Sequence, residues 1–232
     1  MTGRTFAAVV PPPHVIEEME DYIAPRREAD RRLSWVWPEH WHITTLFIED
    51  LPDRSLDPLL EGLGALAART QRFAVRLAGG GCFPDPFQAK VFYLGVTTGQ
   101  ETLAALSKTG RALASTVGAP PDGARFVPHV TLARTRTRFD GTRWLGVLDS
   151  FGAFDWEATE LTLIRSHLRQ GQRKRSRYEV LGRFPFKSEA ARPDPSRPRR
   201  GPIDTAEERW ARPVSVLERE ARARESGNHW RG

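Results

Sequence analysis

A short motif occurs twice in this chain, and each copy lies in a run of residues typical of a β-strand. His42-Ile43-Thr44-Thr45 recurs 87 residues later as His129-Val130-Thr131-Leu132. Residues i and i+2 of a strand share a face, so the histidine and the threonine of each copy point to one side. The intervening apolar residue points to the other side. The pattern predicts two half-buried strands, each with one apolar face and one face that carries an imidazole and a hydroxyl.

Two such strands side by side would place two imidazoles and two hydroxyls around one point, which suits phosphoryl chemistry. One neutral imidazole takes a proton from water, and the other, protonated, gives a proton to the leaving oxygen. The hydroxyls of Thr44 and Thr131 donate hydrogen bonds to phosphate oxygens. We therefore take His42 and His129 as the candidate catalytic pair and the two threonines as substrate-binding residues. A second interpretation stays open, because histidines in strands are often packed or hydrogen-bonded structural residues.

The sequence predicts no metal centre and no cofactor. It lacks the clustered carboxylates that a two-metal phosphatase needs, and its single cysteine, Cys82, excludes a cysteine-based zinc site and an internal disulfide. His40 and His42 have the alternation of a metal-binding pair on a strand. No third ligand is apparent near them, so we interpret His40 as a surface residue near the cleft.

Positive charge is concentrated in one short segment of the chain. The formal net charge is +6, and residues 165–187 alone hold 8 Lys and Arg against 1 Asp or Glu. A basic patch of this kind favours a polyanion such as RNA. We predict that Arg173, Lys174 and Arg175 contact the RNA backbone. A solvated basic loop without a ligand explains the charge equally well.

Hydrophobic periodicity and turn residues predict alternating short strands and helices, which indicates an α+β protein. Strands are expected at residues 5–10, 42–51, 73–78, 90–96, 126–135, 159–169 and 178–186, and helices at 12–32, 56–70, 98–117 and 142–148. Ser55 is the expected N-cap of the second helix. Three glycines at residues 79–81 are expected to break or bulge the third strand.

The two ends of the chain differ from this pattern. The apolar run at residues 6–10 is too short for the core of a signal peptide, and no stretch is long enough to cross a membrane, so we expect a cytoplasmic protein without a membrane partner. Residues 191–202 are rich in Pro and Arg, which is typical of a flexible linker. We predict one domain over residues 1–187 and a loosely attached or disordered tail over 188–232, with a helix at 205–224.

Several segments, taken in order, resemble the 2H phosphoesterase superfamily, and specifically the RNA 2′,3′-cyclic phosphodiesterases once called 2′-5′ RNA ligases. The resemblance covers about residues 4–186, and the stretch Arg125–Arg134, RFVPHVTLAR, carries it most strongly. The other matching segments are residues 4–8, 12–13, 37–44, 87–96, 163–166 and 178–181.

This resemblance implies a bilobal α+β fold, in which two antiparallel sheets with outer helices face each other across a central cleft. It also implies metal-independent hydrolysis of RNA 2′,3′-cyclic phosphate ends to 2′-phosphomonoesters by the two histidines. We further expect a monomer whose partners are RNA ends such as tRNA fragments. Three alternatives stay open: 2′-5′ RNA ligation, a phosphodiesterase for small cyclic nucleotides, and a non-catalytic RNA-binding module on the same fold.

The residues that follow the first motif depart from the family pattern. An arginine, Arg134, follows the second motif. Relatives often read Leu-Arg-Phe-Leu-Gly after the first motif, whereas this chain reads Thr45-Leu46-Phe47-Ile48-Glu49, which removes an arginine from that strand. After the second motif, strict alternation predicts that Arg134 points away from His129 and serves structure more than substrate.

Three tryptophans flank the first motif. They offer either a stacking platform for a nucleobase or a large apolar contribution to the core. We favour core packing for this set: Trp35, Trp37 and Trp41.

Overall fold

The computed structural model describes residues 4–167 and 176–188 of the 232-residue chain. The predicted RNA-contacting residues Arg173, Lys174 and Arg175 lie outside the described residues, as does the predicted tail from residue 189 onward. The domain boundary and the tail helix therefore stay predictions.

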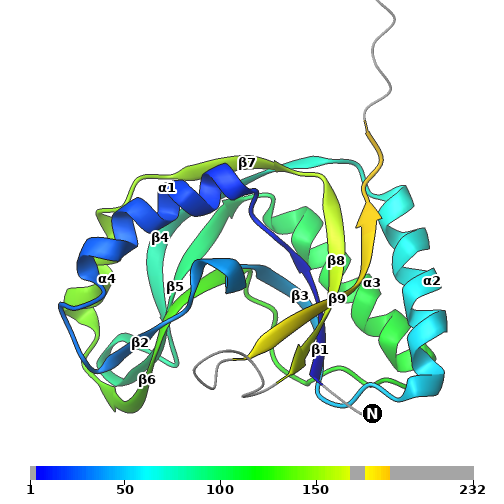
Figure 1. Ribbon diagram of the computed structural model, residues 1–232, viewed down its shortest axis with the longest axis horizontal. Coiled ribbons are helices and arrows are strands. Elements are labelled where there is room, and N and C mark those ends of the chain that lie inside the picture. Colours follow the sequence, from blue (N-terminus) through cyan, green and yellow to red (C-terminus); the bar gives the residue numbers. More distant parts are fainter. Residues whose placement is uncertain (1–3, 168–175, 189–232) are drawn as a thin grey trace, which may run out of the picture. The chain divides into compact units, whose positions relative to one another are not determined.

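The described strands form one antiparallel sheet in the order β7-β4-β5-β6-β3-β1-β8-β9, with β2 paired to β6 (Figure 1). The strands are β1 (Arg4–Val9), β2 (Leu33–Trp35), β3 (Ile43–Ile48), β4 (Phe73–Phe83), β5 (Ala89–Thr98), β6 (His129–Phe139), β7 (Phe154–Ala158), β8 (Glu160–His167) and β9 (Arg177–Pro185). The antiparallel strands were predicted, but the separation into two sheets was wrong.

The two halves of the sheet are joined by the motif strands themselves. β3 and β6 pair where Ile43 lies opposite Val130, the apolar residues that follow His42 and His129. This contact gives each strand a backbone partner, so neither half keeps a free edge there. Periodicity along a strand reports which residues are buried and not which strand lies beside it, so the junction was not predictable from the pattern.

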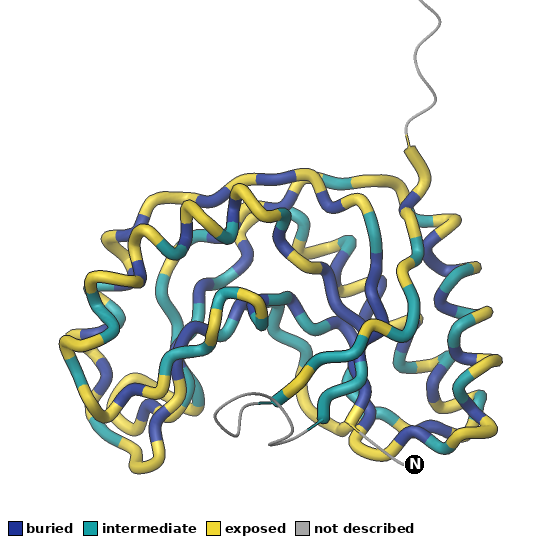
Figure 2. The backbone as a smooth tube through the Cα atoms, viewed as in Figure 1, coloured by how far each residue is buried: buried dark blue, intermediate teal, exposed yellow. Residues whose placement is uncertain are grey.

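The helices lie on the outer side of the curved sheet (Figure 1). α1 (Pro13–Ile23) and α4 (Thr142–Asp149) pack against β7 and β4, whereas α2 (Asp53–Arg69) and α3 (Gln100–Thr116) pack against β8, β9 and β3. Their inward faces carry apolar residues at helical spacing, as with the fully buried Leu59 and Leu63 of α2. Buried residues therefore follow the strands and one side of each helix (Figure 2).

Some predicted boundaries were wrong. The first helix ends at Ile23 rather than residue 32, because Pro25 lacks an N–H and the chain turns there into a short 3₁₀ segment, Ala24–Arg26. Ser55 is not an N-cap: it lies inside α2, and its buried hydroxyl donates to the carbonyl of Val117 at 2.7 Å. The short strand β7 was not predicted.

The three glycines of β4 were expected either to break or to bulge the strand, and the structure shows a bulge. β4 continues to Phe83, and its pairing with β5 shifts between Leu77 and Gly80. Gly79 in this shift has a φ of +79°, which favours glycine.

In the described part of the chain, no helix has both the length and the apolar character needed to cross a membrane.

Candidate active site

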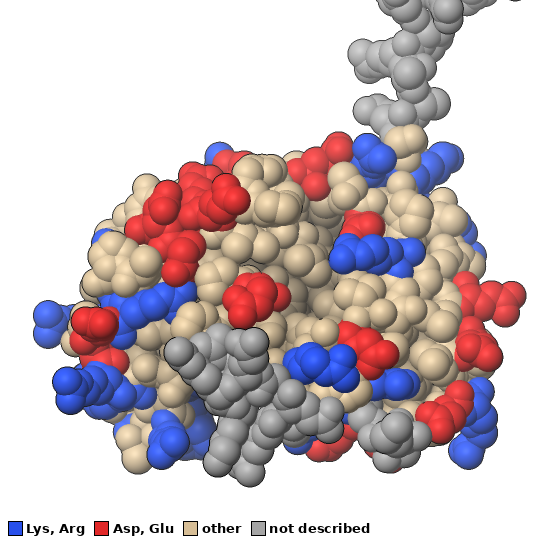
Figure 3. Space-filling model, viewed as in Figure 1, with Lys and Arg blue, Asp and Glu red and all other residues tan. Residues whose placement is uncertain are grey.

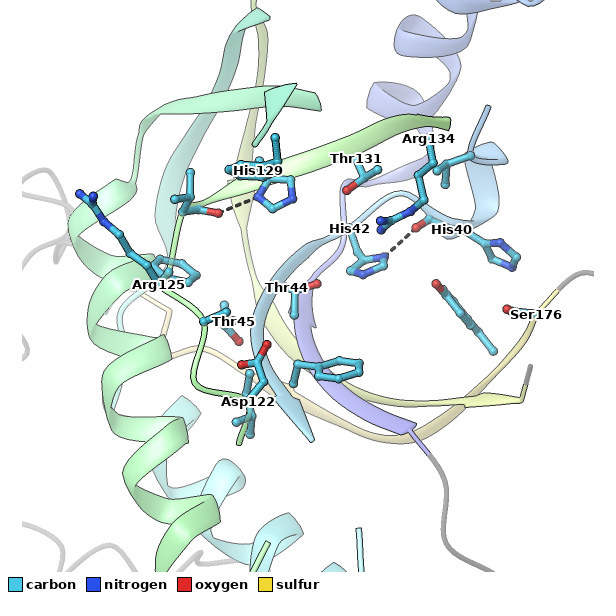
Figure 4. Close-up of a pocket in the computed structure, with 18 of the residues that line it drawn as sticks. His40, His42, Thr44, Thr45, Asp122, Arg125, His129, Thr131, Arg134 and Ser176 are labelled. Atoms are coloured by element: carbon cyan, nitrogen blue, oxygen red, sulfur yellow. Dashed lines mark hydrogen bonds between the residues drawn. The ribbon is translucent and has the colours of Figure 1, made fainter. Parts of the chain in front are cut away.

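The four side chains of the two motifs line one cavity of about 660 Å³. Thr44 enters it from the strand β3 and His42 from the residue immediately before that strand, whereas His129 and Thr131 enter it from β6 (Figure 4). The i, i+2 alternation that predicted a shared face for each histidine and threonine is therefore present in both strands. The junction between β3 and β6 brings the two faces together.

The imidazoles of His42 and His129 are anchored in the same way. His42 Nδ1 lies 2.6 Å from the carbonyl oxygen of His40, and His129 Nδ1 lies 2.7 Å from that of Val127 (Figure 4). A carbonyl can only accept, so Nδ1 donates in both rings. In each neutral imidazole, Nε2 is then the unprotonated nitrogen left for a ligand in the cavity.

A β-bulge follows the threonine in each motif strand. Ala8 of β1 pairs with Thr44 and Ala7 pairs with Leu46, so Thr45 is an extra residue in β3. Tyr93 of β5 pairs with Thr131 and Phe92 pairs with Ala133, so Leu132 is an extra residue in β6. Thr45 and Leu132 are both buried. Both bulges stand three residues after the histidine, so the two strands share this irregularity.

The bulges turn the fifth residue after each histidine back toward the cavity. Phe47 and Arg134 both line it, and Figure 4 shows the Arg134 side chain extending toward His42. The prediction that Arg134 points away from His129 was wrong, because strict alternation does not account for the extra residue Leu132.

Burial and positive charge disfavour a proton on His42. The ring of Phe6 stacks on the His42 imidazole, with the ring centroids 4.5 Å apart. The ring of Tyr178 meets the same imidazole edge-on, with the centroids 5.9 Å apart. Burial lowers the pKa of His42 to about 4. Positive charge on His129 or His40, when either ring is protonated, and on Arg134 acts in the same direction. The hydrogen bond to the His40 carbonyl opposes this shift without cancelling it.

The surroundings of His129 resemble those of His42. The ring centroids of Tyr93 and Phe83 lie 4.8 and 5.2 Å from the centroid of its imidazole. Burial lowers the pKa of His129 below its usual value of 6.5, and the charge of Arg134 adds to this effect. Both imidazoles are therefore predominantly neutral at neutral pH in the protein without substrate.

The loop that precedes β6 borders one end of the cavity. The Asp122 N–H donates to the Phe47 carbonyl at 3.1 Å, and Arg111 Nη1 lies 3.0 Å from Asp122 Oδ1. These bonds tie the loop to β3 and α3. The loop carries Val127, the residue that anchors His129, so they also help to fix the second imidazole.

The remaining residues that the sequence singled out have different positions. His40 lines the cavity with its ring 4.2 Å from that of Tyr178, as expected of a residue near the cleft. Trp41 is buried in the core, as predicted, whereas Trp37 lines the cavity and is 38% exposed. Among the described residues, no group of three or more His, Cys, Asp or Glu side chains is arranged to hold a metal ion.

Comparison with known proteins identifies the family. The model of the 2′-5′ RNA ligase superfamily matches residues 11–170, more than half of the chain. The chain belongs to this superfamily, the 2H phosphoesterases.

Curated members of the superfamily are similar to this chain at modest identity. One, named RNA 2′,3′-cyclic phosphodiesterase, from Geobacillus stearothermophilus, is 29% identical over 162 residues, which are 66% of this chain. This match spans about half, 48%, of the Geobacillus protein. A protein of the same name from Aeropyrum pernix is 30% identical over 152 residues, which are 64% of this chain and 85% of that protein.

A solved structure of similar fold is the crystal structure of TT0787 from Thermus thermophilus. It matches with a TM-score of 0.64 and 26% identity, over 81% of this chain and all of that chain. This chain therefore shares its fold, a curved antiparallel sheet with outer helices, with the Thermus protein.

Proposed function

We propose that this chain hydrolyses RNA 2′,3′-cyclic phosphate ends to 2′-phosphomonoesters, with His42 and His129 as a metal-independent acid/base pair. The observation that carries the proposal is the matched anchoring of two imidazoles in one cavity, each with Nδ1 bound to the carbonyl two residues earlier. The names of the relatives support the choice of substrate.

In the proposed reaction, one neutral imidazole takes a proton from the attacking water through Nε2. A bond forms between the water oxygen and phosphorus, and the bond between phosphorus and the ribose 3′ oxygen breaks. The other imidazole, protonated, gives its proton to that 3′ oxygen, so the product keeps the phosphate on the 2′ oxygen. Thr44, Thr131 and Arg134 stabilise the charge that develops on the non-bridging oxygens.

One imidazole must gain a proton before the reaction, although both are neutral in the protein without substrate. An anionic phosphate in the cavity raises the pKa of a nearby imidazole, because it favours the charged form. Substrate binding therefore supplies the protonated member of the pair. The near-symmetry of the two motifs leaves either histidine able to take either role.

RNA is the proposed partner because basic residues continue beyond the cavity. Arg136 and Arg138 follow Arg134 on β6 and are exposed. Basic side chains gather at the lower left of the space-filling view, where β6 ends (Figure 3). Arg173, Lys174 and Arg175 stay candidate contacts from the sequence. Unchanged affinity and salt dependence after their neutralisation would remove them from the proposal.

The experiment is hydrolysis of a short RNA that ends in a 2′,3′-cyclic phosphate, with EDTA present, by wild type, His42→Asn and His129→Asn. Asparagine keeps an N–H for the backbone carbonyl and removes the acid/base nitrogen. Activity that survives EDTA, gives a 2′-phosphate and is lost in both variants supports the proposal. A wild-type protein that binds the cyclic end without opening it would contradict it.

Two further substrates separate the alternative functions. Equal turnover of a cyclic mononucleotide and of a longer RNA would favour a small cyclic-nucleotide phosphodiesterase. Joining of a 5′-hydroxyl RNA to the cyclic end would favour 2′-5′ ligation. The cytoplasmic location and the monomeric state stay predictions.

A further inference from the structure

Tyr178 projects from β9 into the cavity from a direction that neither motif covers. It pairs with Ser166 of β8 and lines the cavity. The centroid of its ring lies 4.2 Å from that of His40 and 5.2 Å from that of Phe6. Its ring meets the His42 imidazole edge-on, with the two centroids 5.9 Å apart. These contacts fix the ring beside the first catalytic candidate.

The hydroxyl of Tyr178 is available to a ligand. The Tyr178 side chain lines the cavity, and no hydrogen bond joins its hydroxyl to another described residue. Burial raises the pKa of Tyr178, so the phenol keeps its proton at neutral pH and can donate one hydrogen bond.

Arg134 lies in the same cavity as Tyr178 and both histidines. The charge of its guanidinium acts on both imidazoles and on the Tyr178 hydroxyl. A cation and a neutral donor beside two imidazoles suit an anionic phosphate oxygen, because hydrogen bonds to charged acceptors are stronger than those to neutral ones.

We propose that Tyr178 is a further substrate-binding residue, whose hydroxyl donates a hydrogen bond to a non-bridging phosphate oxygen on the side of the cavity shared by His42 and Arg134. The inference rests on the proposed function, because it assumes that the cavity holds a phosphate.

Tyr93 provides a matched control. It also packs against a candidate catalytic histidine, with its ring 4.8 Å from that of His129, but it does not line the cavity. It lies over Gly81, where an added Cβ would be 2.5 Å from the Tyr93 hydroxyl oxygen. Tyr178→Phe and Tyr93→Phe therefore remove the same atom beside the two histidines, and only the first removes a donor from the cavity.

The test measures kcat/KM for the cyclic-phosphate RNA and the affinity for inorganic phosphate, in wild type and in both variants. Tyr178→Phe keeps all ring contacts, and thermal unfolding checks that both variants remain folded. We expect Tyr178→Phe to lower kcat/KM about tenfold or more and to weaken phosphate binding, as loss of a hydrogen bond to a charged group does. Tyr93→Phe should change both quantities less than about twofold.

The outcomes separate this inference from the proposed function. Turnover by wild type with unchanged phosphate affinity in Tyr178→Phe would overturn the phosphate contact and leave the function standing. Weakened phosphate binding in Tyr178→Phe, in a wild-type protein that opens no cyclic phosphate, would support the contact and remove the function. Equal losses in Tyr93→Phe and Tyr178→Phe would also overturn the contact, and neither turnover nor phosphate binding by wild type would overturn both proposals.

Discussion

The two motif strands are built alike and differ in charge. In both motifs the Nδ1–H of the histidine donates to a backbone carbonyl, the threonine follows on the same face, and a bulge comes one residue later. The residue that the bulge returns to the cavity is Phe47 in β3 and Arg134 in β6. The geometry is therefore duplicated, whereas only one of the two motif strands, β6, carries a basic side chain into the cavity.

This difference gives a direction to an otherwise near-symmetric cavity. A phosphate anion is attracted toward Arg134, while Phe47 offers an apolar surface on the matching position of the other strand. The histidines also differ in degree, because burial, together with positive charge on Arg134 and on neighbouring imidazoles when they are protonated, lowers the pKa of His42 to about 4. Matched anchoring supports an acid/base pair, and unequal charge orients its substrate.

The largest expected effect tests whether the two histidines act as a unit. His42→Asn and His129→Asn should each lower kcat by about 10²–10⁴, the usual contribution of general acid–base catalysis. The double variant should be little worse than either single variant, because removal of one partner already stops the proton relay. Single-turnover hydrolysis measures all three. Independent losses that multiply in the double variant would show that the strands do not work together.

The second prediction concerns stability and separates His42 from its counterpart. The pKa of His42 is about 4 in the folded protein and 6.5 in an unfolded chain, so its neutral form contributes stability fully above pH 6.5. This contribution, about 3 kcal/mol, is lost as the pH falls from 6.5 through 4.

Denaturant unfolding at neutral pH and near pH 4 measures the change. His42→Asn should show a smaller decline in the free energy of unfolding than wild type does over this range. An identical decline in the two proteins would show that His42 is not held neutral by the fold.

The third prediction compares the two residues that the bulges return to the cavity. Arg134→Gln should lower kcat/KM roughly 10- to 100-fold, because it removes a charged donor to the phosphate. Phe47→Leu keeps an apolar side chain at the matching position and should cost less. Arg134→Gln should also raise the pKa of both histidines, which moves the pH profile of kcat/KM to higher pH. A Phe47 variant that loses as much as the Arg134 variant would remove the asymmetry.

The smallest expected effect tests the shared threonines. Thr44→Val and Thr131→Val each remove one neutral hydroxyl with little change of volume, and each should lower kcat/KM between about twofold and tenfold. A larger loss for Thr131→Val would sharpen the comparison, because it would place more of the phosphate contact on the Arg134 strand. The measurement is steady-state hydrolysis of the same RNA.

Features that depend on local periodicity were predictable from the sequence. The strands around His42 and His129, the shared faces with Thr44 and Thr131, and the helix now labelled α3 follow from the spacing of apolar residues. The burial of Trp41 follows from its size and apolar surface.

Features that depend on pairing between distant strands were not predictable. The face on which Arg134 lies is set by the extra residue Leu132, and nothing in its residue type marks a bulge. Tyr178 reaches His42 only because β9 pairs with β8 and β8 pairs with β1, next to β3. The single sheet likewise depends on the contact between Ile43 and Val130.

The pH dependence of kcat/KM for wild-type hydrolysis of the cyclic-phosphate RNA tests the paired-histidine account most directly. This ratio reports the free protein, in which His42 has a pKa of about 4 and the pKa of His129 lies below 6.5. Catalysis needs one neutral and one protonated imidazole, so the account predicts a bell-shaped profile with its maximum below pH 6.5. A maximum above pH 6.5, or a profile with only one limb, would contradict it.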